Sequence, residues 1–190
     1  PGITEPMEET EMKSFLTTSA FLVMLLAFTS TQAWDPKGIE EDVAKGQKAI
    51  DALLENNPSM QRYFDAAAGY VVIPTVGKGG IGIGGARGKG LLYENGAPTA
   101  EVTMTQLSIG FQWGGQAYSE FIFFEDTGAL EHFKKGNYEL GAQASAVAVT
   151  AGASIDAGYE SGVAIFTQTK GGLMYEAAVG GQKFKVKALK

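Results

Sequence analysis

The residues with the clearest potential for ligand chemistry lie in a glycine-rich segment, residues 77–90. Lys78, Arg87 and Lys89 stand there among eight glycines. Lys and Arg side chains bind phosphate and carboxylate oxygens, and glycines let backbone N–H groups approach an anion closely. The segment therefore predicts a site for an anionic group such as a lipid headgroup. The glycines alone also fit strands against which another backbone or an aromatic ring packs closely.

Two nucleotide-binding motifs are only partly matched in this segment. Gly80, Gly82 and Gly85 have the GxGxxG spacing, but that fingerprint must open a helix within a βαβ unit. Residues 91–96 instead have the pattern of a strand and a turn. A Walker A loop requires Ser or Thr after its lysine, whereas Lys89 is followed by glycine. We therefore expect no nucleotide cofactor.

A second basic group lies near the C-terminus, where Lys183, Lys185 and Lys187 alternate with apolar residues. Alternate side chains of a strand point to the same face of a sheet, so a strand here presents a row of ammonium groups. Such a row either protects an edge strand from pairing with another molecule or forms a surface for anionic lipid, at about 1 kcal/mol for each lysine. The sequence is compatible with both roles.

Catalytic groups are sparse in this sequence. His132 has Glu131 beside it and Glu125 nearby, so a small hydrolase built on a His–carboxylate pair is an alternative. A histidine in such a charged stretch is more often an exposed helix residue. The chain has no Cys and one His, which excludes a thiol nucleophile and a zinc site with several histidines. We expect neither an enzyme nor a metal or other cofactor.

The composition is that of one globular domain with a hydrophobic core. The chain has 190 residues, of which 45% are hydrophobic and 19% charged, and its formal net charge is -6 at pH 7. This negative charge disfavours broad electrostatic binding of nucleic acid. An anionic partner must therefore meet a local basic patch.

The N-terminal region has the pattern of a targeting segment. A charged residue precedes an apolar stretch over residues 15–28, and a short polar tail ends at Ala33. The apolar stretch is shorter than the roughly 20 residues of a membrane-spanning helix, and Thr31 and Ala33 are the small residues that cleavage requires. We therefore expect a Sec signal peptide over residues 12–33, preceded by an upstream extension, residues 1–11. An uncleaved anchor or a buried core helix is the alternative.

Helices are predicted in residues 36–68. Apolar residues from Ile39 to Leu54 recur at the spacing of one helix face, and Pro36 suits a first helical position. Asn57, with the proline after it, can cap a second, short helix. Because the first helix is amphipathic, its apolar face could lie among lipid headgroups.

Strands are predicted after the helices, because 23 of the 26 glycines lie from Gly69 onward, interleaved with Val, Ile, Phe, Tyr and Thr. We predict one domain over residues 34–190 of α+β class. Its helices precede a mostly antiparallel, Gly-rich β-barrel or two-sheet structure in residues 69–188, with one short helix inserted at residues 126–135. The expected strands cover residues 70–74, 80–86, 90–94, 100–113, 117–124, 138–150, 162–169, 173–179 and 183–188.

Several blocks of the sequence resemble the Ysc84/SYLF lipid-binding domain. They fall within residues 39–186 and comprise residues 67–74, 76–90, 107–116, 121–124, 140–145 and 171–174. The resemblance implies a domain without catalytic chemistry that binds phospholipids, phosphoinositides in eukaryotic members, through basic residues and an amphipathic N-terminal helix. The family's closing block usually carries several basic residues, whereas residues 166–172 here contain only Lys170.

These features predict a non-enzymatic, exported protein, periplasmic or extracellular, that binds anionic phospholipid. The glycine-segment cations are preferred over the C-terminal lysines as its contact. The alternative is an interaction or self-assembly module of the cell envelope, and the sequence identifies no protein partner. The residues expected at the lipid site are Lys78, Arg87, Lys89, Lys170, Lys183, Lys185 and Lys187.

Cleavage of the predicted signal peptide should leave a mature protein that begins at Trp34, because the junction after Ala33 has small residues at both required positions. N-terminal sequencing of exported protein checks this. A start at or before Met12 would contradict it.

Overall fold

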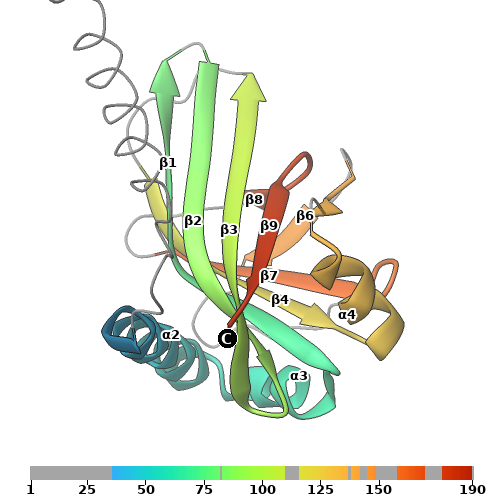
Figure 1. Ribbon diagram of the computed structural model, residues 1–190. Helices are drawn as coiled ribbons and strands as arrows, with labels where there is room; N and C mark the ends of the chain where they lie inside the picture. The colour runs from blue at the N-terminus through green and yellow to red at the C-terminus, as the bar shows by residue number, and fades with distance from the viewer. Residues whose placement is uncertain are drawn as a thin grey trace, which may run out of the picture. The chain divides into compact units, whose positions relative to one another are not determined.

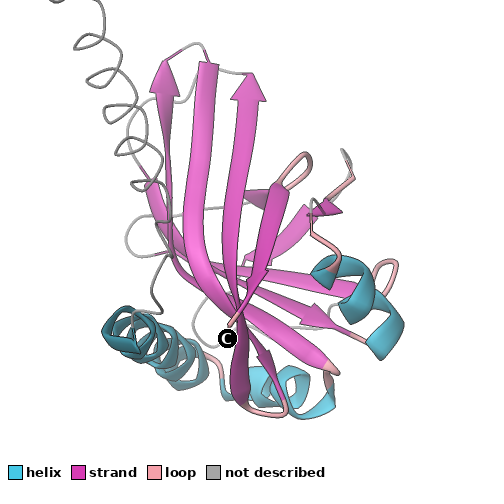
Figure 2. Cartoon of the chain, viewed as in Figure 1, coloured by secondary structure: helices cyan, strands magenta, loops and turns pink. Residues whose placement is uncertain are grey.

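The computed structural model describes residues 36–81, 83–109, 116–136, 138–141, 145–148, 158–169 and 177–189. The predicted signal peptide, the upstream extension and Lys170 lie outside these residues. Helices come first along the described chain, followed by strands with one inserted helix (Figure 1). The α+β class is therefore confirmed, and strands make up most of the fold (Figure 2).

The N-terminal helices follow the predicted amphipathic pattern. They are α2 (Pro36–Asn56), the single 3-10 turn η1 (Pro58–Met60) and α3 (Gln61–Ala66). Ala49, Ile50 and Leu53 of α2 are buried. The predicted cap at Asn57 is wrong: its side chain makes no capping hydrogen bond, and its Oδ1 accepts one from Ser59 Oγ at 2.7 Å. No helix among the described residues has both the length and the apolar composition to cross a membrane.

The inserted helix is also present, as α4 (Thr127–Lys134). Its N-terminus is capped by Asp126, whose carboxylate accepts a hydrogen bond from the Ala129 backbone N–H at 2.8 Å. Leu130 and Phe133 are buried against the sheet. The helical spacing of these two residues therefore predicted both the helix and its buried side.

The described strands form one sheet, in the order β5-β9-β3-β2-β1-β4-β7-β6-β8. Every pair is antiparallel except β6 with β7. The strands are β1 (Gly69–Ile81), β2 (Ile83–Glu94), β3 (Ala97–Ile109), β4 (Gln116–Phe124), β5 (Tyr138–Glu139), β6 (Ser145–Ala148), β7 (Val163–Thr169), β8 (Ala177–Ala178) and β9 (Lys183–Ala188).

The sheet curls into a half-barrel, because β4 and β7 run across the direction of β1, β2 and β3 (Figure 1). The mostly antiparallel prediction is confirmed, but the closed barrel and the two-sheet alternative are wrong for the described residues, where the strand order has two ends. The single strand expected over residues 138–150 is also wrong. That region instead supplies β5, which pairs with β9, and β6, which pairs with β7.

Two long strands contain the glycine-rich segment, instead of the several short strands predicted there. β1 continues past Pro74 because a bulge between Val72 and Thr75 shifts its register against β2. Gly90 lies opposite this bulge, and a Cβ there would stand 2.0 Å from the Val72 carbonyl oxygen. Only glycine leaves room for the bulge, so the glycine allows the strand to remain continuous.

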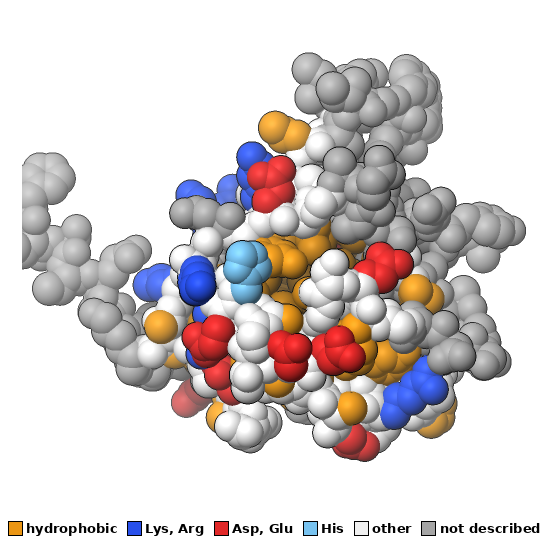
Figure 3. Space-filling model, turned by 90° about the vertical axis from the view of Figure 1, so that its right-hand side faces the viewer, with side chains coloured by type: hydrophobic (Ala, Val, Ile, Leu, Met, Phe, Trp, Pro, Cys, Tyr) orange, Lys and Arg blue, Asp and Glu red, His pale blue; other side chains and the backbone are white. Residues whose placement is uncertain are grey.

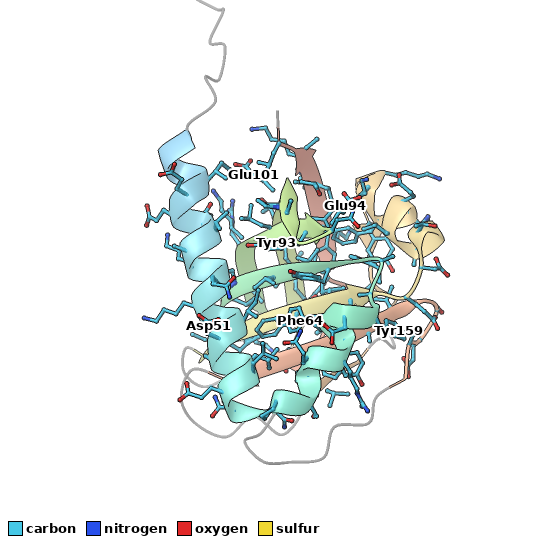
Figure 4. The ribbon with its side chains drawn as sticks, turned by 90° about the horizontal axis from the view of Figure 1, so that it is seen from below. Asp51, Phe64, Tyr93, Glu94, Glu101 and Tyr159 are labelled. Carbon is cyan, nitrogen blue, oxygen red and sulfur yellow. The ribbon has the colours of Figure 1, made fainter. Side chains whose placement is uncertain are left out.

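Each face of the sheet carries its own hydrophobic cluster. Val71, Ile122 and Phe184 belong to the cluster on the concave face, which α4 helps to cover. Val72 and Phe123 directly follow Val71 and Ile122 in the sequence, so they point to the opposite face. They belong to the cluster on the convex face, which α2 and α3 cover. Figure 4 shows these two helices lying over the sheet. The strands in this half of the molecule are therefore buried on both sides.

A carboxyl group lies within the concave cluster. Glu120 is fully buried, and its Oε2 accepts a hydrogen bond from Gln182 Nε2 at 3.0 Å. Its strand partner on β7 is Thr167, and no cation contacts it among the described residues. Burial raises the pKa of Glu120 to about 7, because a charged carboxylate loses its hydration there without gaining a counterion.

The buried acid makes stability depend on pH. Between about pH 4.5 and pH 7 the unfolded chain releases the Glu120 proton while the folded chain keeps it, so the free energy of unfolding falls as the pH rises. The loss should reach about 3 kcal/mol above pH 7. Glu120→Gln removes it, so this variant should melt at a higher temperature than the parent at pH 8 and at a similar temperature at pH 5.

Thermal melting of both proteins at the two pH values measures the effect. Glu125→Gln is the matched control, because Glu125 lies on the surface just beyond β4 and should change the melting temperature little at either pH. A difference between Glu120→Gln and the parent that stays constant from pH 5 to pH 8 would show that Glu120 does not titrate as described.

Candidate functional site

The cations of strand β2 lie on the convex face of the sheet. Arg87 and Lys89 are both exposed, and they alternate with Gly88, which is buried. Leu91 follows Lys89 by two residues and therefore lies on the same face, where it belongs to the convex cluster beneath α2 and α3. Arg87 and Lys89 therefore stand on the part of the convex face that continues beyond the helices.

The C-terminal lysines lie on the same face. Phe184 points into the concave cluster, so Lys183, Lys185 and Lys187 point the other way. Strand β3 joins the two groups: Thr105 pairs with Arg87 on one side and with Lys183 on the other. The same register places Lys89 and Lys185 on either side of Thr103.

The two basic groups that the sequence presented as rivals thus form one surface, which we call the basic face. Strands β2 and β9 are two positions apart in the sheet, about 10 Å, so their side chains can contact one ligand surface together. Figure 3 views the molecule from the side on which His132 lies, and in it most of the visible Lys and Arg side chains lie toward the left, with acidic side chains among them. The basic face consists of Arg87, Lys89, Lys183, Lys185 and Lys187.

Acidic side chains neutralise only part of the basic face. Lys183 Nζ lies 3.4 Å from Glu139 Oε2, and Lys187 Nζ lies 3.6 Å from Glu101 Oε2. These pairs are exposed, and such pairs contribute little to stability, so an anionic ligand can displace them. The other three cations form no ion pair with any described residue.

A pocket of ≈ 420 Å³ opens on this face where β1, β2, β3 and β9 meet. Its lining includes the cross-strand row Gly77, Arg87, Thr105 and Lys183, with Gly85 and Leu107 beside it. The two glycines provide no side chain to fill the hollow. Leu107 is 85% exposed, an unusual position for a large apolar residue. The glycine-rich segment supplies only part of this pocket, and the sequence did not indicate the walls that come from β3 and β9.

Lys78 does not lie with the other cations. Val76 and Ala86 both belong to the concave cluster. Lys78 follows Val76 by two residues and pairs with Ala86, so it lies on the same face as these two residues. Its side chain therefore points to the concave side and is half-buried. The predicted trio of Lys78, Arg87 and Lys89 is thus divided between the two faces of one hairpin, and Lys170 lies outside the described residues.

The apolar side of α2 is not available to a membrane in this structure. It packs on the convex face, where Gly46 lies so close to the Tyr93 hydroxyl that a Cβ there would stand 2.7 Å from the oxygen. Burial raises the pKa of Tyr93 to about 12. The prediction that this helix face meets lipid headgroups is therefore wrong for the folded domain described here.

His132 lies on the exposed side of α4. Its ring packs edge-on against Tyr138, with 5.5 Å between the ring centroids. The neighbouring Glu131 carboxylate instead pairs with Lys134 Nζ at 2.8 Å. Among the described residues no carboxylate pairs with His132, so the arrangement needed for the hydrolase alternative is not formed there.

Comparison with known proteins finds a family to which part of the chain is similar. Residues 105–188 match the model of the Ysc84 family, described as "Las17-binding protein actin regulator". The chain is also 28% identical, over 139 residues, to "Beta cell expansion factor A" of Aeromonas veronii. That alignment covers 72% of this chain and 52% of the relative, so the chain spans about half of the relative's length. The segment from β3 to β9 is therefore similar to the Ysc84 (SYLF) family, in agreement with the resemblance that the sequence blocks predicted.

Proposed function

We propose that this protein is a non-enzymatic, exported binder of anionic phospholipid that meets the membrane with its basic face. The observation that carries the proposal is the convergence of cations from β2 and β9 on a part of the sheet that no helix of the described residues covers. Export rests on the signal-peptide pattern of residues 12–33. The family match agrees with a binding role, since its description names binding and regulation and no reaction.

The distribution of charge explains how a chain of net charge -6 can bind an anionic surface. At physiological ionic strength, charges more than about 8 Å from the contact are largely screened. Attraction therefore depends on the cations at the contact, each of which contributes about 1 kcal/mol near a charged membrane. Arg87, Lys89 and Lys185, which form no ion pair with a described residue, lie together on one face and satisfy this condition.

Strand geometry favours a flat ligand surface over a small partner. Alternate residues of a strand are about 7 Å apart along its axis and neighbouring strands about 5 Å apart, so the basic face is a grid of charges. A bilayer offers anionic groups over its whole surface, and each cation of the grid can meet one. The exposed Leu107 on the same face adds an apolar contact beside the charges.

Both strands of the basic face should contribute to binding. The double variants Arg87→Gln with Lys89→Gln and Lys185→Gln with Lys187→Gln should each bind vesicles of phosphatidylglycerol and phosphatidylcholine about 10- to 30-fold more weakly than the parent. Their remaining binding should also depend less on salt, because fewer counterions are exchanged on contact. Co-sedimentation with vesicles over a series of salt concentrations measures both effects.

The control for these variants removes the same charge elsewhere. Lys78→Gln with Lys135→Gln should bind like the parent, because Lys78 points to the concave side and Lys135 follows α4. Equal loss in all three double variants would mean that only net charge matters, and the basic face would not be the contact. Sedimentation of the protein without vesicles would support the self-assembly alternative instead.

A further inference from the structure

The pocket on the basic face has the features of a phosphate site. Thr105 of β3 pairs with Arg87 of β2 on one side and with Lys183 of β9 on the other. Two cations and a hydroxyl donor therefore line one pocket. Among the described residues that line it, none is acidic. Arg is the side chain best suited to bind phosphate oxygens with two parallel hydrogen bonds, and Arg87 forms no ion pair with a described residue.

The glycines account for the depth of the hollow. A Cβ built on Gly77 meets no atom within 4 Å, and one built on Gly85 meets only the Gln106 carbonyl oxygen, at 3.4 Å. Neither glycine has a positive φ, so neither backbone conformation requires glycine. Unlike Gly90, which a bulge requires, these two glycines have no packing role that the structure shows, and their effect is to keep the pocket open.

The size and rim of the pocket favour a lipid headgroup over an isolated ion. Its volume of ≈ 420 Å³ lies in the range of about 300–1,000 Å³ that holds small organic ligands. Leu107 stands at the rim, where it is exposed to solvent. A phosphate bound between Arg87 and Lys183 would leave Leu107 facing the glycerol and acyl region of the same lipid.

We propose that this pocket binds the phosphate-bearing headgroup of one anionic lipid, with Gly77 and Gly85 as its floor and with Arg87, Thr105 and Lys183 as its phosphate ligands. This rests on the proposed function and makes it more specific. The basic face then acts in two ways, since one lipid is held in a shaped site while the remaining cations, Lys89, Lys185 and Lys187, attract the surrounding membrane. Binding depends on shape as well as on charge.

Gly77→Val tests the role of shape without changing any charge. The added side chain points into open space on the convex face and occupies the pocket floor. Exclusion of the phosphate should cost one charge-assisted hydrogen bond, or about tenfold in affinity for phosphatidylglycerol vesicles. Gly158→Val is the matched control, because a Cβ there also meets no atom within 4 Å and Gly158 does not line the pocket.

Thr105→Val provides a second test that retains a β-branched side chain of similar volume and removes only the hydroxyl donor. It should weaken vesicle binding about three- to tenfold, and melting temperatures of all the variants establish that they are folded. If Gly77→Val and Thr105→Val bind vesicles like the parent while the basic-face double variants lose binding, the headgroup pocket is wrong and the proposed function stands.

Soluble phosphate separates a lipid site from a site for a free anion. Inorganic phosphate, compared with chloride at equal ionic strength, should displace the parent from vesicles only weakly, because it lacks the contacts at Leu107. Thermal stabilisation by inorganic phosphate without vesicle binding would assign the pocket to a free anion and overturn both proposals. Failure of the parent to bind either phosphate or vesicles would also overturn both.

Discussion

The bulge in β1 opposite Gly90 determines on which face of the sheet the side chains of β1 beyond Thr75 lie. Side chains of a strand alternate between faces, so a register shift of one residue would exchange every residue beyond it. Before the bulge, Val71 points to the concave cluster and Val72 to the convex cluster. After the bulge, Val76 points to the concave side. On the neighbouring strand β2, Arg87 and Lys89 point to the convex side. The missing Cβ at Gly90 is what allows this register.

The sheet has different roles along its length as a consequence. In the half covered by α2 and α3 both faces are buried, and large aromatic side chains such as Phe121 and Phe123 fill the convex cluster. In the other half, the convex side carries Thr and Lys residues beside glycines, and no helix of the described residues covers it. The hydrophobic clusters and the basic face therefore occupy different ends of the same strands.

Much of this fold could be predicted from residue patterns that act locally. The helix over residues 36–56, the short helix within residues 126–135 and the turn at Asn95 and Gly96, both with positive φ, each depend on neighbouring residues. The order of the strands in the sheet and the pairing of β9 with β3 could not be predicted, because they depend on residues far apart in the chain. The error at Lys78 has the same origin: its face is set by a bulge and a turn that a count along the sequence does not reveal.

The pairing of β9 with β3 also makes the basic face depend on the integrity of the whole sheet. Lys183 reaches Thr105 from far along the chain, so no short segment carries this surface by itself. A chain in which β9 is not paired with β3 presents only Arg87 and Lys89 of the five cations together, and it lacks the wall of the pocket that Lys183 forms. The arrangement of the five cations is therefore a property of the completed sheet and not of either strand alone.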